Sequence, residues 1–125
     1  MSILIYLSFC PYSQHPVVPD IGQVDKVTHV ALAFLPSSSF AQAQDGGVEP
    51  GASPKWPLFI SVEEARARFA PDTKILVSIG GWGDTAGFSA AARTPESRRQ
   101  WASRVADMVR DTGADGVDVD WEYPG

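Results

Sequence analysis

Asp115-Gly116-Val117-Asp118-Val119-Asp120-Trp121-Glu122 places four carboxylates within eight residues. Side chains alternate between the two faces of an extended strand, so the last three acids share one face. The two valines and the tryptophan share the other face. Such an apolar face packs on helices, and the acidic face must then point into a barrel or a crevice.

The three acids on one face predict a coupled set of titrating groups. Neighbours on the same face of a strand lie about 7 Å apart at Cα, so their charges repel. We expect one or more of them to hold a proton near neutral pH, as a general acid requires. A solvated acidic loop or an edge strand is the first alternative, which the alternation with valine and tryptophan disfavours. A Ca²⁺ or Mg²⁺ site is the second, although the EF-hand pattern belongs to a loop.

Three further apolar runs precede this stretch, at residues 3–9, 28–35 and 74–79. Each is short and ends at proline or glycine, and with the run at 116–121 they read as four buried strands. Their separations are too long for hairpins and indicate crossover connections between parallel strands.

Two helices are marked by their ends. Ser61 and Glu64 form a capping box that predicts a helix over 62–69, stopped by Pro71. Thr94 is the expected N-cap of a second helix, with proline at its first position and Gly113 as its stop. An apolar stripe at helical spacing predicts the core-facing side of this helix. Its members are Trp101, Val105, Met108 and Val109.

The alternation of strands and helices limits the fold class to α/β, as a doubly wound sheet or a β/α barrel. In both, chemistry sits at the carboxyl ends of the strands, where the acidic run lies. Residues 36–57 are rich in Ser, Gly, Gln and Pro and predict an exposed loop.

Composition narrows the class of protein further. The 125 residues suit one domain, and 44% hydrophobic with 20% charged residues is typical of a globular chain. The net charge of −5 disfavours nucleic acid and anionic membranes as partners. No apolar run approaches the ~18 residues of a membrane span, and the N-terminus reads as a strand rather than a signal peptide. The single cysteine, Cys10, is expected to be buried or half-buried, and His15 and His29 are not expected to be catalytic.

At this point the motifs resemble a known family. Residues 115–124 resemble the DGxDxDxE signature on the fourth strand of family 18 glycoside hydrolases, the chitinases. Residues 74–82 are similar to the SxGG motif of that family, and Phe88-Ser89 with residues 94–98 resemble its third crossover. The order and separation of the motifs match the family over residues 28–125.

The resemblance implies a (β/α)8 barrel and a retaining reaction assisted by the substrate, a known exception to the two-carboxylate scheme. Glu122 would be the general acid and later the base. Asp120 would orient the 2-acetamido group of the sugar, and Asp118 would share a proton with Asp120. Asp115 would be structural. No metal or organic cofactor is implied, and the implied partner is chitin or a chitooligosaccharide.

Other residues would support the site or bind sugar. Ser78, Gly80 and Gly81 would shape its floor, because glycine allows close backbone approach. Trp82 and Tyr123 would stack on sugar rings, and Tyr6 would line the site from the first strand. Trp101 is assigned to the core.

The chain also departs from the family pattern. An eight-fold barrel needs about 250 residues, so residues 1–125 are expected to be the N-terminal half of the catalytic domain, truncated after the fourth strand. We expect little activity from this chain alone. A noncatalytic, chitooligosaccharide-binding half barrel that self-associates remains an alternative, as does an endo-β-N-acetylglucosaminidase acting on N-glycans. The sequence assigns no compartment, although members of the family are often extracellular.

Overall fold

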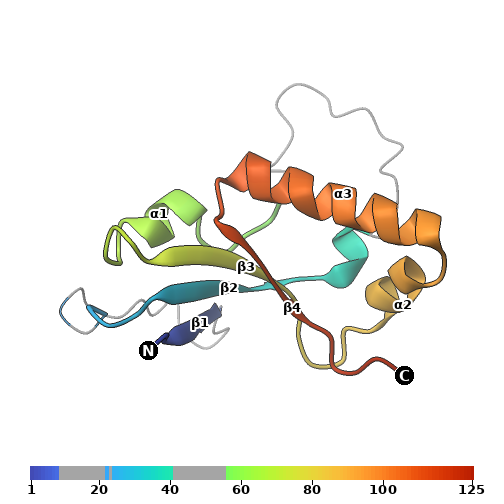
Figure 1. Ribbon diagram of the computed structural model, residues 1–125, viewed down its shortest axis with the longest axis horizontal. Coiled ribbons are helices and arrows are strands. Elements are labelled where there is room, and N and C mark those ends of the chain that lie inside the picture. The colour runs from blue at the N-terminus through green and yellow to red at the C-terminus, as the bar shows by residue number, and fades with distance from the viewer. Residues whose placement is uncertain (9–21, 23, 41–55) are drawn as a thin grey trace.

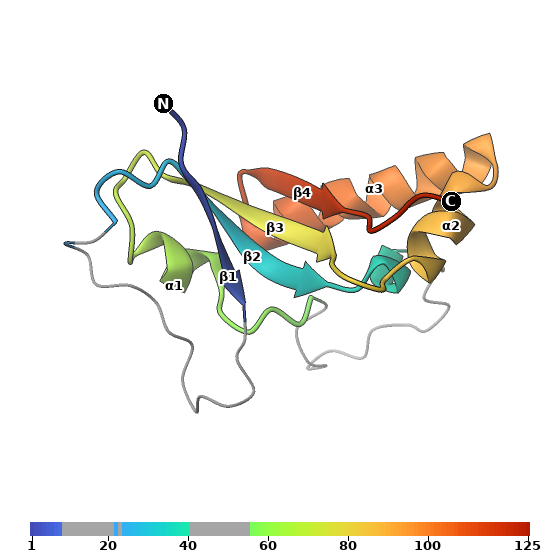
Figure 2. The same cartoon turned by 90° about the horizontal axis from the view of Figure 1, so that it is seen from below.

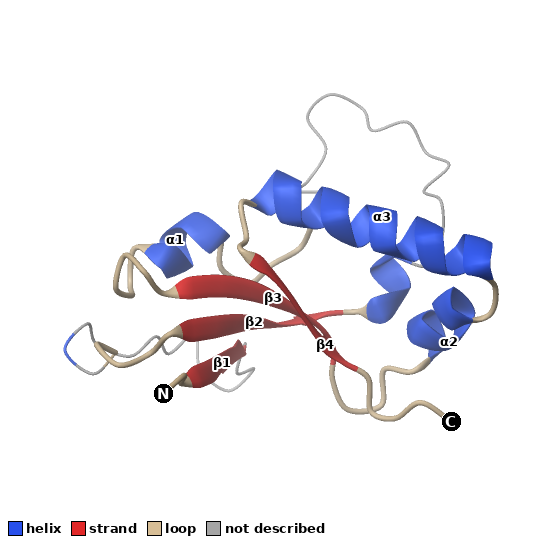
Figure 3. Cartoon of the chain, in the orientation of Figure 1, coloured by secondary structure: helices blue, strands red, loops and turns tan. Residues whose placement is uncertain are grey.

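The computed structural model describes residues 1–8, 22, 24–40 and 56–125. Their elements alternate between strands and helices along the chain (Figures 1 and 3). In order they are β1 (Leu4–Ser8), β2 (His29–Leu35), the 3-10 helix η2 (Ser37–Phe40), α1 (Val62–Arg66), β3 (Lys74–Gly80), α2 (Ala86–Ala92), α3 (Pro95–Thr112) and β4 (Gly116–Asp120).

The strands form one parallel sheet. Within the described residues its order is β1-β2-β3-β4, and each neighbouring pair runs parallel. The predicted parallel arrangement, with crossover connections, is therefore confirmed. The ends of the strands lie within two residues of those expected. Phe9, the last residue of the first expected strand, lies outside the described residues, as do Cys10 and His15.

The helices cover one face of this sheet (Figures 1 and 2). Alternate residues of the central strands point into that layer and are completely buried, among them Val30, Leu32, Ile75 and Val77. They form one hydrophobic core with buried side chains of the helices, including Met108. The opposite face, called here the inner face, exposes side chains of β1 and β2.

The long helix follows its sequence signals closely. Thr94 accepts a hydrogen bond from the amide of Ser97, and the Ser97 hydroxyl accepts one from the amide of Thr94. Pro95 opens α3, and Gly113 ends it with a φ of 74°, a left-handed conformation that glycine adopts without strain. The expected apolar stripe faces the core, with Met108 completely buried.

Other local predictions were wrong in part. The helix expected over 62–69 ends at Arg66, because the next amides bond three residues back, Arg68 to Ala65 and Phe69 to Arg66, in tighter turns. The loop expected over 36–57 begins with η2, whose Ser37 and Phe40 are buried. Residues 41–55 of that loop lie outside the described residues. The sequence also gave no sign of α2, which lacks a side-chain cap.

Strand β4 lies at one edge of the described sheet, the position that its alternating pattern was expected to disfavour. Val117 and Trp121 pack against the core, as expected for the apolar face. Val119 does not, and 51% of its surface is exposed. The apolar face of β4 is thus covered by the helices at both ends and open in the middle.

The core predicts a large stability loss for Met108→Ala. The Met108 side chain is completely buried between α3 and the sheet, so its removal leaves a cavity as well as lost burial. We expect the free energy of unfolding to fall by about 2–5 kcal/mol, measured by urea titration. The exposed Arg99→Ala is the control and should change it little. Equal stability of the two variants would show that α3 does not pack as described.

Candidate active site

The candidate site lies at the carboxyl ends of β3 and β4 (Figure 2). The register of the two strands places Ser78 beside Asp118 and Gly80 beside Asp120. Asp118 and Asp120 therefore project from the same face of β4, and Glu122 follows two residues later. The motif at residues 74–82 and the acidic motif at residues 115–124 therefore lie side by side on neighbouring strands.

Asp118 is held by two hydroxyl groups from different strands. Ser78 Oγ donates to Asp118 Oδ2 at 2.6 Å, and the Tyr6 hydroxyl donates to the same oxygen at 3.1 Å. Tyr6 lies on β1, at the opposite edge of the sheet from β4. The side chains of the two edge strands meet because the sheet curls around its inner face, as the strands of a barrel do.

The pKa of the Tyr6 phenol is raised at this position. Partial burial raises the pKa of Tyr6, and the hydrogen bond and charge of Asp118 raise it further, with a smaller effect from Asp120. A raised pKa keeps the phenol protonated as a hydrogen-bond donor to Asp118. Tyr6 was placed at the site from its strand position alone, and the structure brings it there.

Gly80 is required by the close approach of β4. Its φ is 112°, and a Cβ at this position would lie 2.2 Å from the carbonyl oxygen of Asp120 and 2.8 Å from the ring of Phe88. Gly81, with a φ of 95°, donates its amide to the same Asp120 oxygen at 2.9 Å. The two glycines therefore bring β3 into close backbone contact with the acidic strand.

An aromatic stack lies behind the acids. Phe88 of α2 stacks on Trp121 at a centroid distance of 5.3 Å and contacts Trp101 at 5.8 Å. The Trp121 Nε1 atom is buried with no hydrogen-bond partner among the described residues. Trp101 also contacts Phe40, so its assignment to the core is confirmed.

Asp120 has a perturbed pKa. Desolvation raises the pKa of Asp120, and the neighbouring charges of Glu122 and then Asp118 raise it further. The direction of this shift agrees with the expected repulsion between neighbouring carboxylates, although desolvation is its largest cause. This group holds its proton to a higher pH than an ordinary aspartate does.

Asp115 differs from the other acids. Its Oδ2 accepts hydrogen bonds from the amide of Ile75 at 2.8 Å and from Arg66 Nη1 at 3.0 Å. The Ile75 amide, more than the Arg66 charge, lowers the pKa of Asp115 below its usual value. These contacts join the start of β4 to α1 and β3 at the end of the sheet away from the other acids.

Exposed aromatic side chains surround the carboxyl ends of the strands. Trp82 is 90% exposed and Tyr123 75% exposed, each next to a sequence motif. Phe34, which sequence reasoning missed, is 45% exposed on the inner face, 6.3 Å from the Tyr6 ring and against Gly81. The register shift in β2 after Leu32 turns Phe34 to this face, and no local sequence signal marks that shift.

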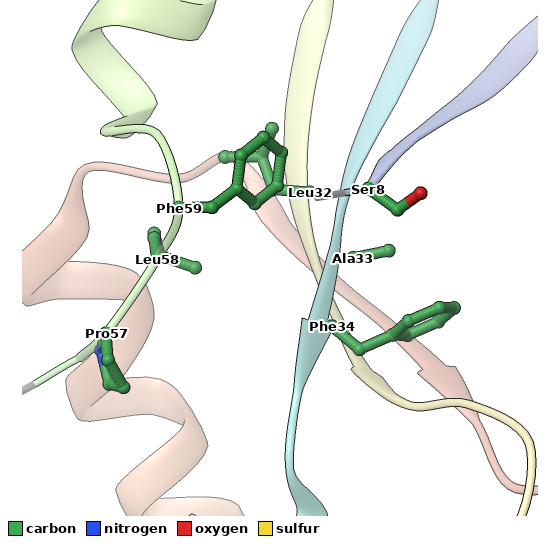
Figure 4. Close-up of a pocket in the computed structure, with 7 residues that line it drawn as sticks. All are labelled: Ser8, Leu32, Ala33, Phe34, Pro57, Leu58 and Phe59. Atoms are coloured by element: carbon green, nitrogen blue, oxygen red, sulfur yellow. The ribbon is translucent and has the colours of Figure 1, made fainter. Parts of the chain in front are cut away.

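His29 lies at the other end of the sheet, at the start of β2. Its Nδ1 is 2.8 Å from the hydroxyl of Thr28. A groove of about 570 Å³ also lies beside β2, facing the segment from Pro57 to Phe59 (Figure 4). None of the carboxylates of β4 lines this groove.

The described residues contain no helix long and apolar enough to cross a bilayer. In the same ranges, no group of three or more histidine, cysteine, aspartate or glutamate side chains is arranged to hold a metal ion.

Parallel strands with helices on one face, and carboxylates at their carboxyl ends, define part of a (β/α)8-barrel enzyme fold. The chain belongs to the glycosyl hydrolases of family 18, whose family model matches residues 3–125.

Relatives and solved structures agree with this assignment. Chitinase C of Streptomyces lividans is 32% identical over 124 residues, covering 82% of this chain and 19% of that protein. Endochitinase 1 of Metarhizium anisopliae is 47% identical over 51 residues, covering 41% of this chain and 12% of that protein. A family 18 N-acetylglucosaminidase from Paenibacillus barengoltzii superposes with a TM-score of 0.64 at 28% identity, covering 98% of this chain and 32% of that chain. The chain thus spans less than a third of the length of each.

The perturbed carboxyl predicts a pH-dependent effect of Asp120→Asn on stability. The pKa of Asp120 is raised in the folded state, so the folded state binds this proton more tightly than the unfolded chain does. The resulting stabilisation is present at low pH and is lost as the pH rises through the raised pKa. The difference in Tm between the Asp120→Asn variant and wild type should therefore be more positive at pH 8 than at pH 3, as measured by thermal unfolding.

Asp115→Asn is the control of opposite sign. The pKa of Asp115 is lowered in the folded state, so its stabilisation is present at neutral pH and is lost as the pH falls through that lowered pKa. Relative to wild type, this variant should lose more Tm at pH 8 than at pH 3, measured by thermal unfolding in the same two buffers. The same pH trend in both variants would contradict the described environments.

Proposed function

We propose that this chain carries the catalytic acid strand of a chitinase, a hydrolase that cleaves β-1,4-linked N-acetylglucosamine polymers with retention of configuration. The observation that carries the proposal is the set of three acids on one edge of the sheet, with Asp118 held by Ser78 and Tyr6. Family membership over residues 3–125 supports the same reaction class.

Glu122 is the general acid in this proposal. It gives its proton to the glycosidic oxygen while the carbonyl oxygen of the substrate's own 2-acetamido group attacks the anomeric carbon. The bond to the leaving sugar breaks, and an oxazolinium ion forms. The Glu122 carboxylate then takes a proton from a water molecule, which attacks the anomeric carbon and restores the acetamido group. The proton returns to Glu122, so the cycle balances.

Asp120 and Asp118 act on the acetamido group. The Asp120 carboxylate orients the N–H of that group and stabilises the positive charge of the oxazolinium ion. Asp118 shares a proton with Asp120, which keeps the charge of Asp120 adjustable between the two steps. The raised pKa of Asp120 supports this role in direction, because desolvation and the charges of Glu122 and Asp118 make its protonated form easier to reach.

The exposed aromatic residues bind the sugar rings. Trp82 and Tyr123 stack on apolar sugar faces at the mouth of the site, and Tyr6 lines its inner face. Phe34, beside Tyr6, is a further candidate for this surface. Ser78, Gly80 and Gly81 shape the floor beneath the bound sugar.

Residues 1–125 act in this proposal as the N-terminal half of the catalytic domain, with little activity alone. The inner face is open, and Tyr6 is 49% exposed in the described structure. An open site screens charges and admits water, which weakens electrostatic catalysis.

A second candidate function is noncatalytic binding of chitooligosaccharides by a self-associated half barrel. The open edges of β1 and β4 in the described sheet, with Leu4, Tyr6 and Phe34 exposed on its inner face, favour this candidate. Pairing of two such sheets would cover both edges and the inner face.

Hydrolysis and binding by the purified chain and a Glu122→Gln variant separate these functions. We expect both proteins to bind penta-N-acetylchitopentaose in calorimetry and neither to bind cellopentaose, which lacks acetamido groups. Slow hydrolysis of a fluorogenic chitooligosaccharide should disappear in Glu122→Gln. Oligomer mass on the same samples shows whether turnover requires a dimer.

The other outcomes are equally informative. Binding without hydrolysis, in a dimer, would favour the noncatalytic half barrel. Glu122-dependent cleavage of a high-mannose glycopeptide but not of chitooligosaccharide would make the substrate an N-glycan. Equal binding of cellopentaose would contradict recognition of the acetamido group.

A further inference from the structure

The loop between β3 and α2 carries Trp82. The carboxylate of Asp84, in the same loop, binds the first residue of η2. Asp84 accepts two hydrogen bonds from Ser37, one from its amide to Oδ2 at 2.6 Å and one from its hydroxyl to Oδ1 at 2.6 Å. Ser37 begins η2, the short helix that follows β2, and is completely buried. Both bonds have the short lengths of charge-assisted hydrogen bonds. We call this contact the Asp84–Ser37 clasp.

Trp82 has few contacts that could fix it. Its side chain is 90% exposed, and its two neighbours, Gly81 and Gly83, both have positive φ values. The direction in which the Trp82 side chain leaves the backbone is therefore set by this tight turn. The Gly81 amide bonds to β4 at one end of the turn, and the Asp84 amide bonds back to the Gly81 carbonyl at 3.1 Å.

A close contact between α2 and η2 lies next to the clasp. A Cβ added at Gly87 of α2 would lie 2.3 Å from backbone atoms of Ser37 and Ser38. The start of α2 therefore touches the start of η2 backbone to backbone beside the clasp. With Asp84 bound to Ser37, the turn that holds Trp82 is fixed on both sides, by β4 and by η2.

We propose that Asp84 is a positioning residue for sugar binding, which acts through Trp82. The inference rests on the proposed function, in which Trp82 stacks on a sugar ring. Asp84 itself does not touch the sugar. It holds the turn so that the exposed indole stands at the mouth of the site before the sugar arrives, which reduces the ordering cost of binding.

Three variants test the clasp: Asp84→Ala, which removes it; Asp84→Asn, which keeps its shape without its charge; and Asp107→Ala, a control that removes an ion-paired carboxylate from α3. An asparagine can still accept from the Ser37 amide and donate to its hydroxyl. Hydrogen exchange of the amides of residues 81–86 is the first measurement. Exchange should become about tenfold faster in Asp84→Ala, and less so in Asp84→Asn, with residues 101–109 unchanged.

Sugar binding is the second measurement. Asp84→Ala should weaken binding of penta-N-acetylchitopentaose roughly threefold to tenfold, with partial recovery in Asp84→Asn and no change in Asp107→Ala. The loss should be non-additive with Trp82→Ala, because removal of the indole leaves the clasp nothing to position. A purely structural role would give additive losses.

Failure of this inference is distinguishable from failure of the proposed function. Unchanged exchange of residues 81–86 in Asp84→Ala would overturn the clasp whether or not the chain binds sugar. Additive losses with Trp82→Ala would overturn positioning while leaving sugar binding intact. Faster exchange of residues 81–86 in Asp84→Ala, combined with no sugar binding by the wild-type chain, would overturn the proposed function and with it the role of Asp84 in sugar binding.

Discussion

The contact between the backbones of Gly80 and Asp120 determines how the site is built. A side chain at Gly80 would overlap the Asp120 carbonyl and the ring of Phe88. Without one, β3 lies close enough to β4 for the Gly81 amide to bond the same carbonyl and for Phe88 to stack on Trp121. The backbone of β4 is thus held by β3 on one side and by the aromatic stack of the helix layer on the other, and the hydroxyls of Ser78 and Tyr6 then hold the carboxylate of Asp118.

The two ends of β4 use their acids in different ways. Asp115 at the start of the strand is paired with Arg66 and a backbone amide, and its charged form is stabilised. Asp120 at the end stands among like charges, and its charged form is destabilised. One short strand therefore contains an aspartate whose charged form is stabilised and an aspartate whose charged form is destabilised, and the difference comes from their surroundings because the residue type is the same.

Sequence reasoning succeeded where the signal is local. The limits of α3 follow from Thr94, Pro95 and Gly113, which satisfy or end the helix by themselves. It failed where contacts between distant parts of the chain determine where a helix or side chain lies. Helix α2 has no capping side chain, and its place depends on Phe88 entering the aromatic stack. Phe34 reaches the inner face through a register shift in β2, and the hydrogen bond from Tyr6 to Asp118 depends on the curl of the whole sheet. Neither can be read from spacing along the chain.

The same curl limits what the described strands can do chemically. It brings Tyr6 and Ser78 to Asp118, but it leaves the inner face open to solvent beside Phe34 and Tyr6. Coupling between carboxylates weakens as the effective dielectric rises, so an open face reduces the very pKa differences that proton transfer uses. Covering the inner face would exclude water and strengthen that coupling without moving any of these residues. Contacts from β1 and β3 therefore hold Asp118 on the acidic strand, whereas the strength of the coupling between the carboxylates depends on how far solvent is excluded from the inner face.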